Sequence, residues 1–489
     1  MTPIRSARGN LENRERNRAL SITAESASTA TIENRYTVGT LSYTKTGLYW
    51  LFVWLLWGDF CFTLMESVVP SLLPLMLKDH GASNKEISII VGTIATALNT
   101  VVGPICSYRS DRHRSRFGRR IPFLIWPTPF IVLFLMLLPY APEIAKWLMQ
   151  VEWVAGLFSH SPVTPVIFLF GLLTVCFQLF NMVVATIYWY LFNDVVPVHY
   201  LGRFFALVRV VGTLAGFCFQ YFIFGLAESH MKEIWIGLGL LYGGAFTLMC
   251  WRVKEGGYPP VTGEERGSVL GDVRNYFRQC FSHRLYLWFY LAYGLYVWST
   301  VAQVFWVFFF RDQLKMDLDT IGKYRSWSLL LVIPLAYPFG LLVDRWRSQR
   351  VIMLATALCA AMNFAAFAFI QDKWSYMVCM ILWNVPVFMI NVANAVWFPE
   401  LLPRARFGQF ASAAALTSAG VTMVMSPFCG WLFDQIQNYR YVFVWAGVMQ
   451  TISFLTLIPV YRAWIRHGGP DNYLAPGDVR VEREKPSHA

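Results

Sequence analysis

The chain has 489 residues, of which 56% are hydrophobic, 17% aromatic and only 14% charged, and its formal net charge is +12. A soluble protein has about 25% charged residues, and its apolar residues do not form long runs. The composition therefore excludes a soluble multi-domain enzyme, and the placement of the basic residues indicates membrane topology rather than nucleic-acid binding.

The first part of the chain, residues 1–47, is rich in Ser, Thr, Asn, Arg and Glu and has little to bury. Such a composition predicts a disordered cytoplasmic tail. A signal peptide needs an apolar stretch close to the start, whereas the first apolar run begins only at about Trp50. We therefore expect that run to remain in the membrane as an anchor.

Long apolar runs then follow one another along the chain. A bilayer core of roughly 30 Å needs about 20 mostly apolar residues in a helix. About twelve runs reach that length, near residues 50–77, 88–108, 121–140, 166–192, 204–227, 234–251, 285–310, 323–343, 351–370, 374–397, 408–433 and 441–464. The predicted fold class is all-α integral membrane, with one transmembrane helix over each run.

A polar and charged stretch from Arg252 to Arg284 divides these runs into two sets. We expect this stretch to be the linker between two bundles of equal size. The predicted domains are an N-terminal six-helix bundle over 48–252, a cytoplasmic linker over 253–284, a C-terminal six-helix bundle over 285–466 and a cytoplasmic C-terminal tail over 467–489.

The basic residues of the short loops predict the orientation, since cytoplasmic loops carry an excess of Lys and Arg. The loop after the second run contains six arginines between Arg109 and Arg120, and the loop after the eighth contains Arg345, Arg347 and Arg350. The alternate loops have few basic residues. Both termini are therefore expected on the cytoplasmic side of a cell membrane, and no nucleic-acid partner is expected.

Two short patterns occur once in each half, which indicates an internal duplication. Ser110-Asp111-Arg112 after the second run corresponds to Val343-Asp344-Arg345 after the eighth. At one constant offset, Asp194, Pro197, Gly202 and Phe204 correspond to Glu400, Pro403, Gly408 and Phe410. We therefore expect two pseudo-symmetric bundles with the substrate site where they meet.

These loops also carry a family resemblance. The segment from Gly340 to Arg350 is similar to the loop signature of the major facilitator superfamily. The segment from Ser110 to Phe123 resembles the corresponding loop of the glycoside–pentoside–hexuronide:cation symporters and sucrose transporters, with Ile121 interrupting its basic run. The resemblance implies the major facilitator fold, alternating access and a monomer.

The resemblance further implies a cytoplasmic gate. Asp111 and Asp344 would hold the cytoplasmic sides of the halves together in the outward-open state, and Asp194 and Glu400 would join their networks. The basic gate candidates are Arg112, Arg119, Arg120 and Arg345, with Arg404 as a further partner. Alternatively, the arginines only fix the topology, since an exposed ion pair contributes about 0–1 kcal/mol.

Three ionisable residues lie within the apolar runs, where a charge is costly and usually functional. Asp59 and Glu66 lie seven residues apart on the first run and share a helix face, and Arg209 enters the fifth run to a depth similar to that of Asp59. The second half has Ala415 in place of Arg209, so the scaffold does not need these charges. Asp59 or Glu66 is the predicted proton-coupling group and Arg209 its counter-ion or a substrate contact; a static buried Asp–Arg pair is the alternative.

Neutral polar side chains are the candidates for the substrate site. In the superfamily, the first, fourth, seventh and tenth helices line the central cavity. An amide can bond a sugar hydroxyl while an indole covers the C–H face, although amides also hydrogen-bond between helices. The candidates are Asn99, Gln178, Asn181, Gln303, Trp306, Asn384, Asn391 and Asn394. Asn99 and Gly103 stand where sodium-coupled relatives have acids, which makes sodium coupling less favoured than proton coupling.

We expect a secondary active transporter that moves a small polar solute, a sugar or glycoside, by proton symport and without a cofactor or metal site. The rivals are an exporter or antiporter of another metabolite or drug, a membrane-embedded enzyme and a transporter-like sensor. The segment from Val211 to Gly216 lacks the proline of the exporter signature, and no catalytic motif is visible, so an enzyme is not expected.

Overall fold

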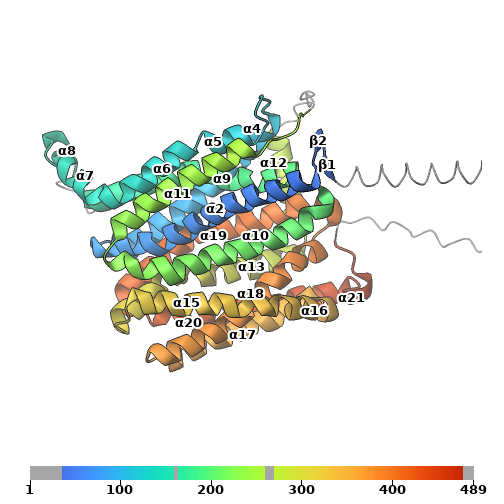
Figure 1. Cartoon of the computed structure of the whole chain (residues 1–489). Helices are drawn as coiled ribbons and strands as arrows, with labels where there is room; N and C mark the ends of the chain where they lie inside the picture. The colour runs from blue at the N-terminus through green and yellow to red at the C-terminus, as the bar shows by residue number, and fades with distance from the viewer. Residues whose placement is uncertain (1–35, 159–163, 259–268, 477–489) are drawn as a thin grey trace, which may run out of the picture.

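The computed structural model describes residues 36–158, 164–258 and 269–476 (Figure 1). Within these residues, twelve helices are long and apolar enough to cross a membrane. They are Lys45–Asp79, Asn84–Arg112, Ile121–Leu148, Pro165–Val195, Val198–Glu228, Met231–Arg252, Arg284–Gln313, Leu318–Trp346, Ser348–Phe369, Lys373–Leu401, Phe407–Ile436 and Tyr441–Arg466. The predicted all-α membrane fold is confirmed.

Short π and 3-10 segments interrupt several of these spans. The first six comprise α2 (Lys45–Asp79); α3 (Asn84–Ser88), η2 (Ile89–Ile94) and α4 (Ala95–Arg112); α5 (Ile121–Ile125), α6 (Thr128–Leu137), η3 (Leu138–Tyr140) and α7 (Ala141–Leu148); α9 (Pro165–Val195); α10 (Val198–Cys218), η4 (Phe219–Ile223) and η5 (Phe224–Glu228); and α11 (Met231–Arg252). The last six comprise α13 (Arg284–Val301), η6 (Ala302–Phe305), α14 (Trp306–Phe308) and η7 (Phe309–Gln313); α15 (Leu318–Val332), η8 (Ile333–Leu335) and α16 (Ala336–Trp346); α17 (Ser348–Phe369); α18 (Lys373–Leu401); α19 (Phe407–Ile436); and α20 (Tyr441–Arg466). Outside the spans lie β1 (Thr37–Val38), β2 (Leu41–Ser42), α8 (Glu152–Phe158), α12 (Val269–Phe281), η9 (Arg404–Arg406) and α21 (Gly469–Asn472).

Polar side chains define where several spans begin. The Thr44 hydroxyl accepts a hydrogen bond from the Gly47 amide at the start of α2. Ser83 forms a capping box at the start of α3, and Asp372 forms one at the start of α18. These caps satisfy amides that have no partner within the helix, so each apolar run becomes a helix with a defined first turn.

The predicted N-terminal tail over 1–47 needs a correction at its end. Residues 1–35 lie outside the described residues, but β1 and β2 form an antiparallel hairpin directly after them. Tyr36 stacks on Tyr200 with ring centroids 5.7 Å apart, and α2 already begins at Lys45. Disorder predicted from polar composition therefore does not extend through residues 36–47, because the hairpin packs against the bundle.

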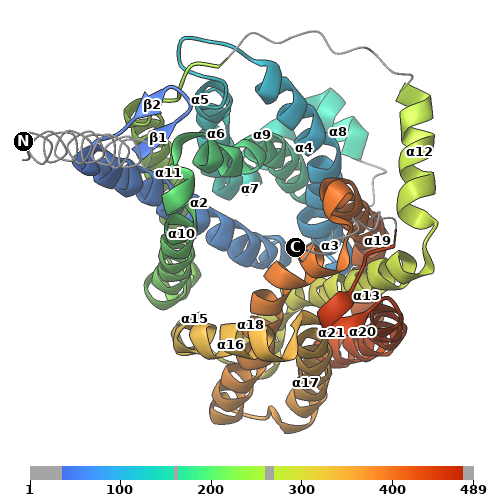
Figure 2. The ribbon, with the colours of Figure 1, turned by 90° about the vertical axis from the view of Figure 1, so that its right-hand side faces the viewer.

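The helices form two bundles side by side. In the first half α2 packs against α10 and α11, and α9 packs against α4 and α6; in the second, α13 packs against α19 and α20, and α17 packs against α18 and α20. The hairpin and α21 lie at one end of the bundle, which we call the terminal end; the opposite end is the distal end (Figure 1). Seen from the terminal end in Figure 2, the two halves occupy the upper and lower parts of the view, and α19 lies beside α3 and α4.

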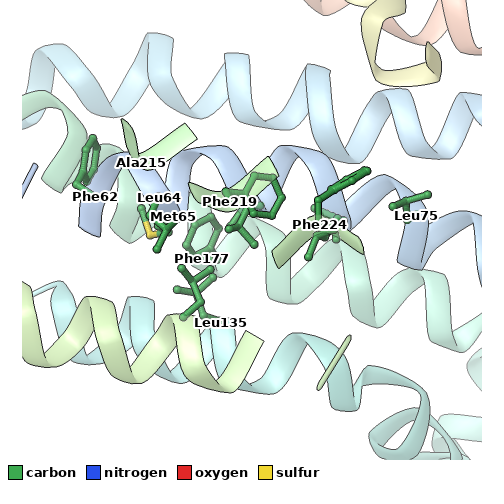
Figure 3. Packing of buried hydrophobic residues seen from close by; sticks show 14 of the residues in the cluster. Phe62, Leu64, Met65, Leu75, Leu135, Phe177, Ala215, Phe219 and Phe224 are labelled. Atoms are coloured by element: carbon green, nitrogen blue, oxygen red, sulfur yellow. The ribbon is translucent and has the colours of Figure 1, made fainter. Parts of the chain in front are cut away.

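Aromatic and aliphatic side chains from different spans fill the core of the N-terminal half (Figure 3). Met65 of α2, Leu135 of α6, Phe177 of α9 and Phe219 of η4 are all at most 1% exposed. Burying such side chains keeps α2 fixed within its own half. Asp59 and Glu66 are carried on this helix.

The halves meet chiefly at the distal end. Here α19 packs against α3 and η2, and α15 packs against η4 and η5. The Ser426 hydroxyl of α19 donates to the Ser88 carbonyl at 2.9 Å, and Arg311 of η7 pairs with Asp79 of α2 at 3.0 Å. These contacts close the distal end, so the structure shows one defined state of the two bundles.

Candidate functional site

A cavity of about 640 Å³ lies between the two halves. It is lined by residues of α2, α9, α10 and α15: Asp59, Thr63, Ser67, Trp189, Phe205, Val208, Arg209, Gly212, Thr213, Gly216 and Leu329. Three of these four helices belong to the N-terminal half, and α15 belongs to the other. The cavity is large enough for a small organic molecule.

Asp59 and Arg209 both line this cavity. Asp59 is 1% exposed, and its Oδ2 atom has no hydrogen-bond partner among the described residues. Arg209 is exposed on the cavity side of α10. The two described side chains form no ion pair within 4.0 Å, so the static buried pair is not present in this state.

Glu66 lies two turns further along α2 and has a partner from another helix. The buried Asn181 of α9 donates its side-chain amide to Glu66 Oε1 at 2.7 Å. Asn181 is 1% exposed, and its own Oδ1 has no partner among the described residues. The structure thus brings together two predicted site residues, one from the coupling set and one from the substrate set.

The seventh span breaks in its middle, where α13 gives way to the 3-10 segment η6 that contains Gln303. Trp306 follows the break and lies edge-on against Trp383 of α18, with ring centroids 4.6 Å apart. Both indoles are nearly buried, and neither Nε1–H has an acceptor among the described residues. Interrupted helices with unpaired polar groups are typical of binding sites in transporters.

The other predicted substrate residues are spread over both halves. Gln178 of α9 has a buried Oε1 without a partner among the described residues, while Asn384 of α18 donates to Ser328 Oγ at 2.9 Å. Asn99 and Asn391 are exposed. Asn394 lines a small void inside the C-terminal half together with residues of α13, α17 and α20. Asn394 is therefore remote from the cavity of Asp59 and Arg209.

A cluster of ion pairs lies at the terminal end of the N-terminal half. Arg119 pairs with Asp194 at 2.6 Å, and Arg120 pairs with Asp111 at 2.5 Å and with Asp194 at 3.0 Å. Arg120 also donates to Ser110 Oγ at 2.8 Å. The hydrogen bonds to Asp194 raise the pKa of Arg119 above its ordinary value. The predicted network of Asp111, Asp194 and the two arginines is present.

Sequence reasoning missed one member of this cluster, Glu255, which follows the sixth span. Its carboxylate accepts hydrogen bonds from the backbone amides of Arg119, Arg120 and Ile121 at 2.9, 2.8 and 2.6 Å. Tyr258 donates to the same carboxylate at 3.2 Å, and the Arg119 guanidinium lies 4.2 Å from the centroid of its ring. Glu255 thereby fixes the loop between the second and third spans to the start of the linker.

The corresponding residues of the C-terminal half form a smaller group. Glu400 accepts a hydrogen bond from Ser348 Oγ and lies 3.9 Å from Arg347. Asp344 and Arg345 are exposed at the end of α16. Arg112 of the first half stacks on Tyr108, with its guanidinium 4.0 Å from the ring centroid. The ion pairs of Asp111, Asp194 and Glu400 thus stay within their own halves in this state.

The sequence profile described as Major Facilitator Superfamily matches residues 55–427, which is most of the chain. The chain belongs to this superfamily. It is therefore a multi-pass membrane transporter that acts on a small solute. A comparison with curated proteins finds no match.

Solved structures share the major facilitator fold at low sequence identity. A bacterial homologue of the human lysosomal transporter Spinster is 11% identical, with a TM-score of 0.63 over 89% of this chain and 100% of that chain. The nucleoside transporter NupG is 13% identical, with a TM-score of 0.60 over 84% of this chain and 99% of that one. A D-xylose–proton symporter is 12% identical, with a TM-score of 0.59 over 84% and 97%. These transporters carry different solutes, so the likeness establishes the fold alone.

Proposed function

We propose that this major facilitator protein is a secondary active transporter that couples a small polar solute, a sugar or glycoside, to protons through alternating access. The observation that carries the proposal is the cavity between the halves, in which a buried Asp59 with an unpaired oxygen faces an exposed Arg209. An acid that is buried without a counter-ion is costly in its charged form, so proton binding and the position of the arginine become linked.

The hydrogen-bonding groups support a polar solute. Thr63, Ser67 and Thr213 place hydroxyl groups on the cavity wall, and Trp189 adds an aromatic face. Glu66 and Asn181 add a carboxylate and an amide from the same two helices, α2 and α9. Hydroxyls, amides and one aromatic ring are the groups that bind sugars in pockets of this size. The resemblance of the Ser110 to Phe123 loop to sucrose transporters favours the same class.

The proposed orientation places both termini and the cluster of Arg119, Arg120 and Asp194 in the cytoplasm. Arginines are concentrated at the terminal end of the bundle, and cytoplasmic loops are the basic ones in multi-pass proteins. The distal end then faces outward in a cell membrane. Because the halves contact each other at the distal end, the structure corresponds to an inward-facing state in this proposal.

The test is a solute-induced proton current in liposomes that contain the purified protein, recorded over mono- and disaccharides with and without sodium. The wild-type protein is compared with Asp59→Asn, Glu66→Gln and Arg209→Ala. Glu143→Gln is the matched control, because Glu143 pairs with Lys232 at the protein surface and neither residue lines the cavity. We expect an inward current with at least one sugar that is lost in an acid variant and kept in the control.

The result also separates the alternatives. Sugar uptake that requires sodium and gives no proton current would show that sodium is the coupling ion. The proposed solute class would then still hold. Silence with every sugar at every pH would overturn sugar symport. Proton-driven efflux of another compound would then favour an exporter.

A further inference from the structure

We propose that Glu228 and Asp434 are a repeat-related pair of gate residues that close the distal end of the transporter, each by capping the first turn of a helix in the opposite half. This inference rests on alternating access, but not on the identity of the solute or the coupling ion. Neither residue belongs to the cavity or to the cluster at the terminal end.

The first contact joins the eleventh span to the second. Asp434 lies near the end of α19, and its two carboxylate oxygens accept hydrogen bonds from the backbone amides of Asn84 and Lys85 at 2.8 and 3.0 Å. These amides open the span that runs from α3 through η2 to α4. The Asn84 side chain adds a further bond across the halves, since it accepts from the Tyr439 hydroxyl at 2.8 Å.

The second contact joins the fifth span to the eighth in the same manner. Glu228 is the last residue of η5, and its Oε1 accepts a hydrogen bond from the backbone amide of Leu318 at 2.9 Å. Leu318 is the first residue of α15. A carboxylate at a helix N-terminus satisfies an amide that has no partner within the helix and interacts favourably with the helix dipole.

The two contacts are equivalent in the internal repeat. Asp434 follows Glu400 by the same number of residues as Glu228 follows Asp194, and Lys85 precedes Asp111 by the same number as Leu318 precedes Asp344. The repeat therefore matches both the acid and the capped amide of each contact. Both contacts join the two halves and are related by pseudo-symmetry. We therefore expect them to open and close together.

Close backbone packing accompanies both contacts. A methyl group at Gly225, one turn before Glu228, would lie 2.7 Å from Asp319 Cβ. A methyl group at Gly430, one turn before Asp434, would collide with the Asn84 carbonyl oxygen and lie 2.6 Å from Ser88 Oγ. Glycine is needed at both places because the helices of the two halves approach more closely than a side chain permits.

The closed distal end thus depends on hydrogen bonds that must break when the halves separate there. Each contact uses a charge-assisted bond, which is stronger than a neutral one but is readily replaced by water once the end opens. Such contacts suit a gate, because they stabilise the closed state without preventing its release.

The test is hydrogen exchange of the intact purified transporter in lipid nanodiscs, read at the first turns of α3 and α15. The variants are Glu228→Ala, Asp434→Ala and the double variant, with Glu143→Ala as the control at the same end. Glu143 pairs with Lys232 inside one half, at 2.5 Å, and caps no helix of the other half. Exchange in α17 shows whether each variant keeps its fold.

The decisive readout is the crossed effect, which is the change in exchange at the helix capped by the acid that was not mutated. If the two contacts open together, Glu228→Ala raises exchange at Asn84 and Lys85, and Asp434→Ala raises exchange at Leu318, each about fivefold as for the loss of one cap. The double variant is expected to show about a twenty-fivefold increase if the losses add. Glu143→Ala is expected to change neither site.

Two outcomes would overturn the proposal. An increase confined to the helix that the mutated acid itself caps would show two local caps and no gate, and unchanged exchange at both sites would show that the acids contribute nothing. If an Ala variant does not fold, Glu228→Gln and Asp434→Asn keep an acceptor oxygen and lose the charge, and the same crossed pattern is required of them. Since no solute is used, a negative result leaves the proposed symport unaffected.

Discussion

Asn181 of α9 donates its side-chain amide to Glu66 of α2 at 2.7 Å, and this bond connects two spans of the N-terminal half beside the cavity. The donor is buried and the acceptor is exposed. A solute that enters from the accessible side can therefore reach the carboxylate, while Asn181 holds the carboxylate in place from behind.

We predict that Asn181→Ala lowers kcat/KM for the transported solute by about ten- to a hundredfold, because a hydrogen bond to a charged group contributes about 1.5–3 kcal/mol. Initial rates of uptake in liposomes measure the effect. Asn193→Ala is the control on the same helix, since the Asn193 side chain donates to the Trp189 carbonyl of its own helix at 3.2 Å and to no other helix among the described residues. Equal rates in the two variants would show that the bond to Glu66 has no role in transport.

Arg120 is predicted to be the arginine on which the terminal cluster depends most. Its side chain is 5% exposed and pairs with both Asp111 and Asp194. Arg120→Ala removes the partner of Asp111 and one of the two arginines that pair with Asp194, which keeps Arg119. We expect a loss of about 1.5–3 kcal/mol in the free energy of unfolding, as for a hydrogen bond to a charged group. Arg120→Lys should lower the free energy of unfolding less than Arg120→Ala does, because lysine keeps the positive charge. It should still lower it, because lysine lacks the planar fork of donors.

Thermal unfolding of the detergent-solubilised protein measures this loss. Arg116→Ala is the control from the same loop, because Arg116 is exposed and lies over the ring of Phe117. If Arg116→Ala and Arg120→Ala lowered the melting temperature equally, the arginines of this loop would be exchangeable and would serve topology alone.

Much of the fold and part of the site could be predicted from the sequence. The twelve spans followed from hydrophobic length, and the network of Asp111, Asp194, Arg119 and Arg120 followed from loop motifs, because such motifs are local in the chain. Glu255 was missed since it bonds backbone amides, which carry no sequence signal, from a polar linker without periodicity.

Other features depend on tertiary packing. The break at η6 lies within a continuous apolar run, so hydropathy predicted an unbroken helix there. Asn394 shares its span with Asn391, yet it faces a void inside the C-terminal half, and only the rotation of α18 against its neighbours determines this. The pair Glu228 and Asp434 could have been found by extending the repeat offset to the ends of the fifth and eleventh spans.

Asp372 gives a prediction for pH. Hydrogen bonds from the Ser375 amide and hydroxyl at the start of α18 lower the pKa of Asp372 below its ordinary value. A group whose pKa is lowered by folding stabilises the folded state above its unfolded pKa, and this contribution is lost as the pH falls through the folded value. We expect the first turn of α18 to be protected at pH 5 and to lose protection progressively below about pH 4.

Hydrogen exchange of residues 373–377, corrected for intrinsic rates, measures this change. Asp372→Asn keeps a side-chain oxygen as acceptor but does not titrate, so its protection should not vary over the same pH range. An identical acid response in the wild-type protein and in Asp372→Asn would assign the change to other carboxylates.

Gly430→Ala is predicted to open the distal end without changing any charge. The added methyl would collide with the Asn84 carbonyl oxygen, and that oxygen belongs to the backbone of α3 and cannot move aside as a flexible side chain could. Gly420→Ala is the matched control, because it lies on the same helix α19 and a methyl there would meet nothing within 4 Å. Both variants have the same gain in helix propensity, about 1 kcal/mol, so the difference between them isolates the contact between the halves.

Exchange at Asn84 and Lys85 should rise in Gly430→Ala and stay at the wild-type level in Gly420→Ala. The same protection in both variants would mean that α19 and α3 can separate slightly without opening the gate.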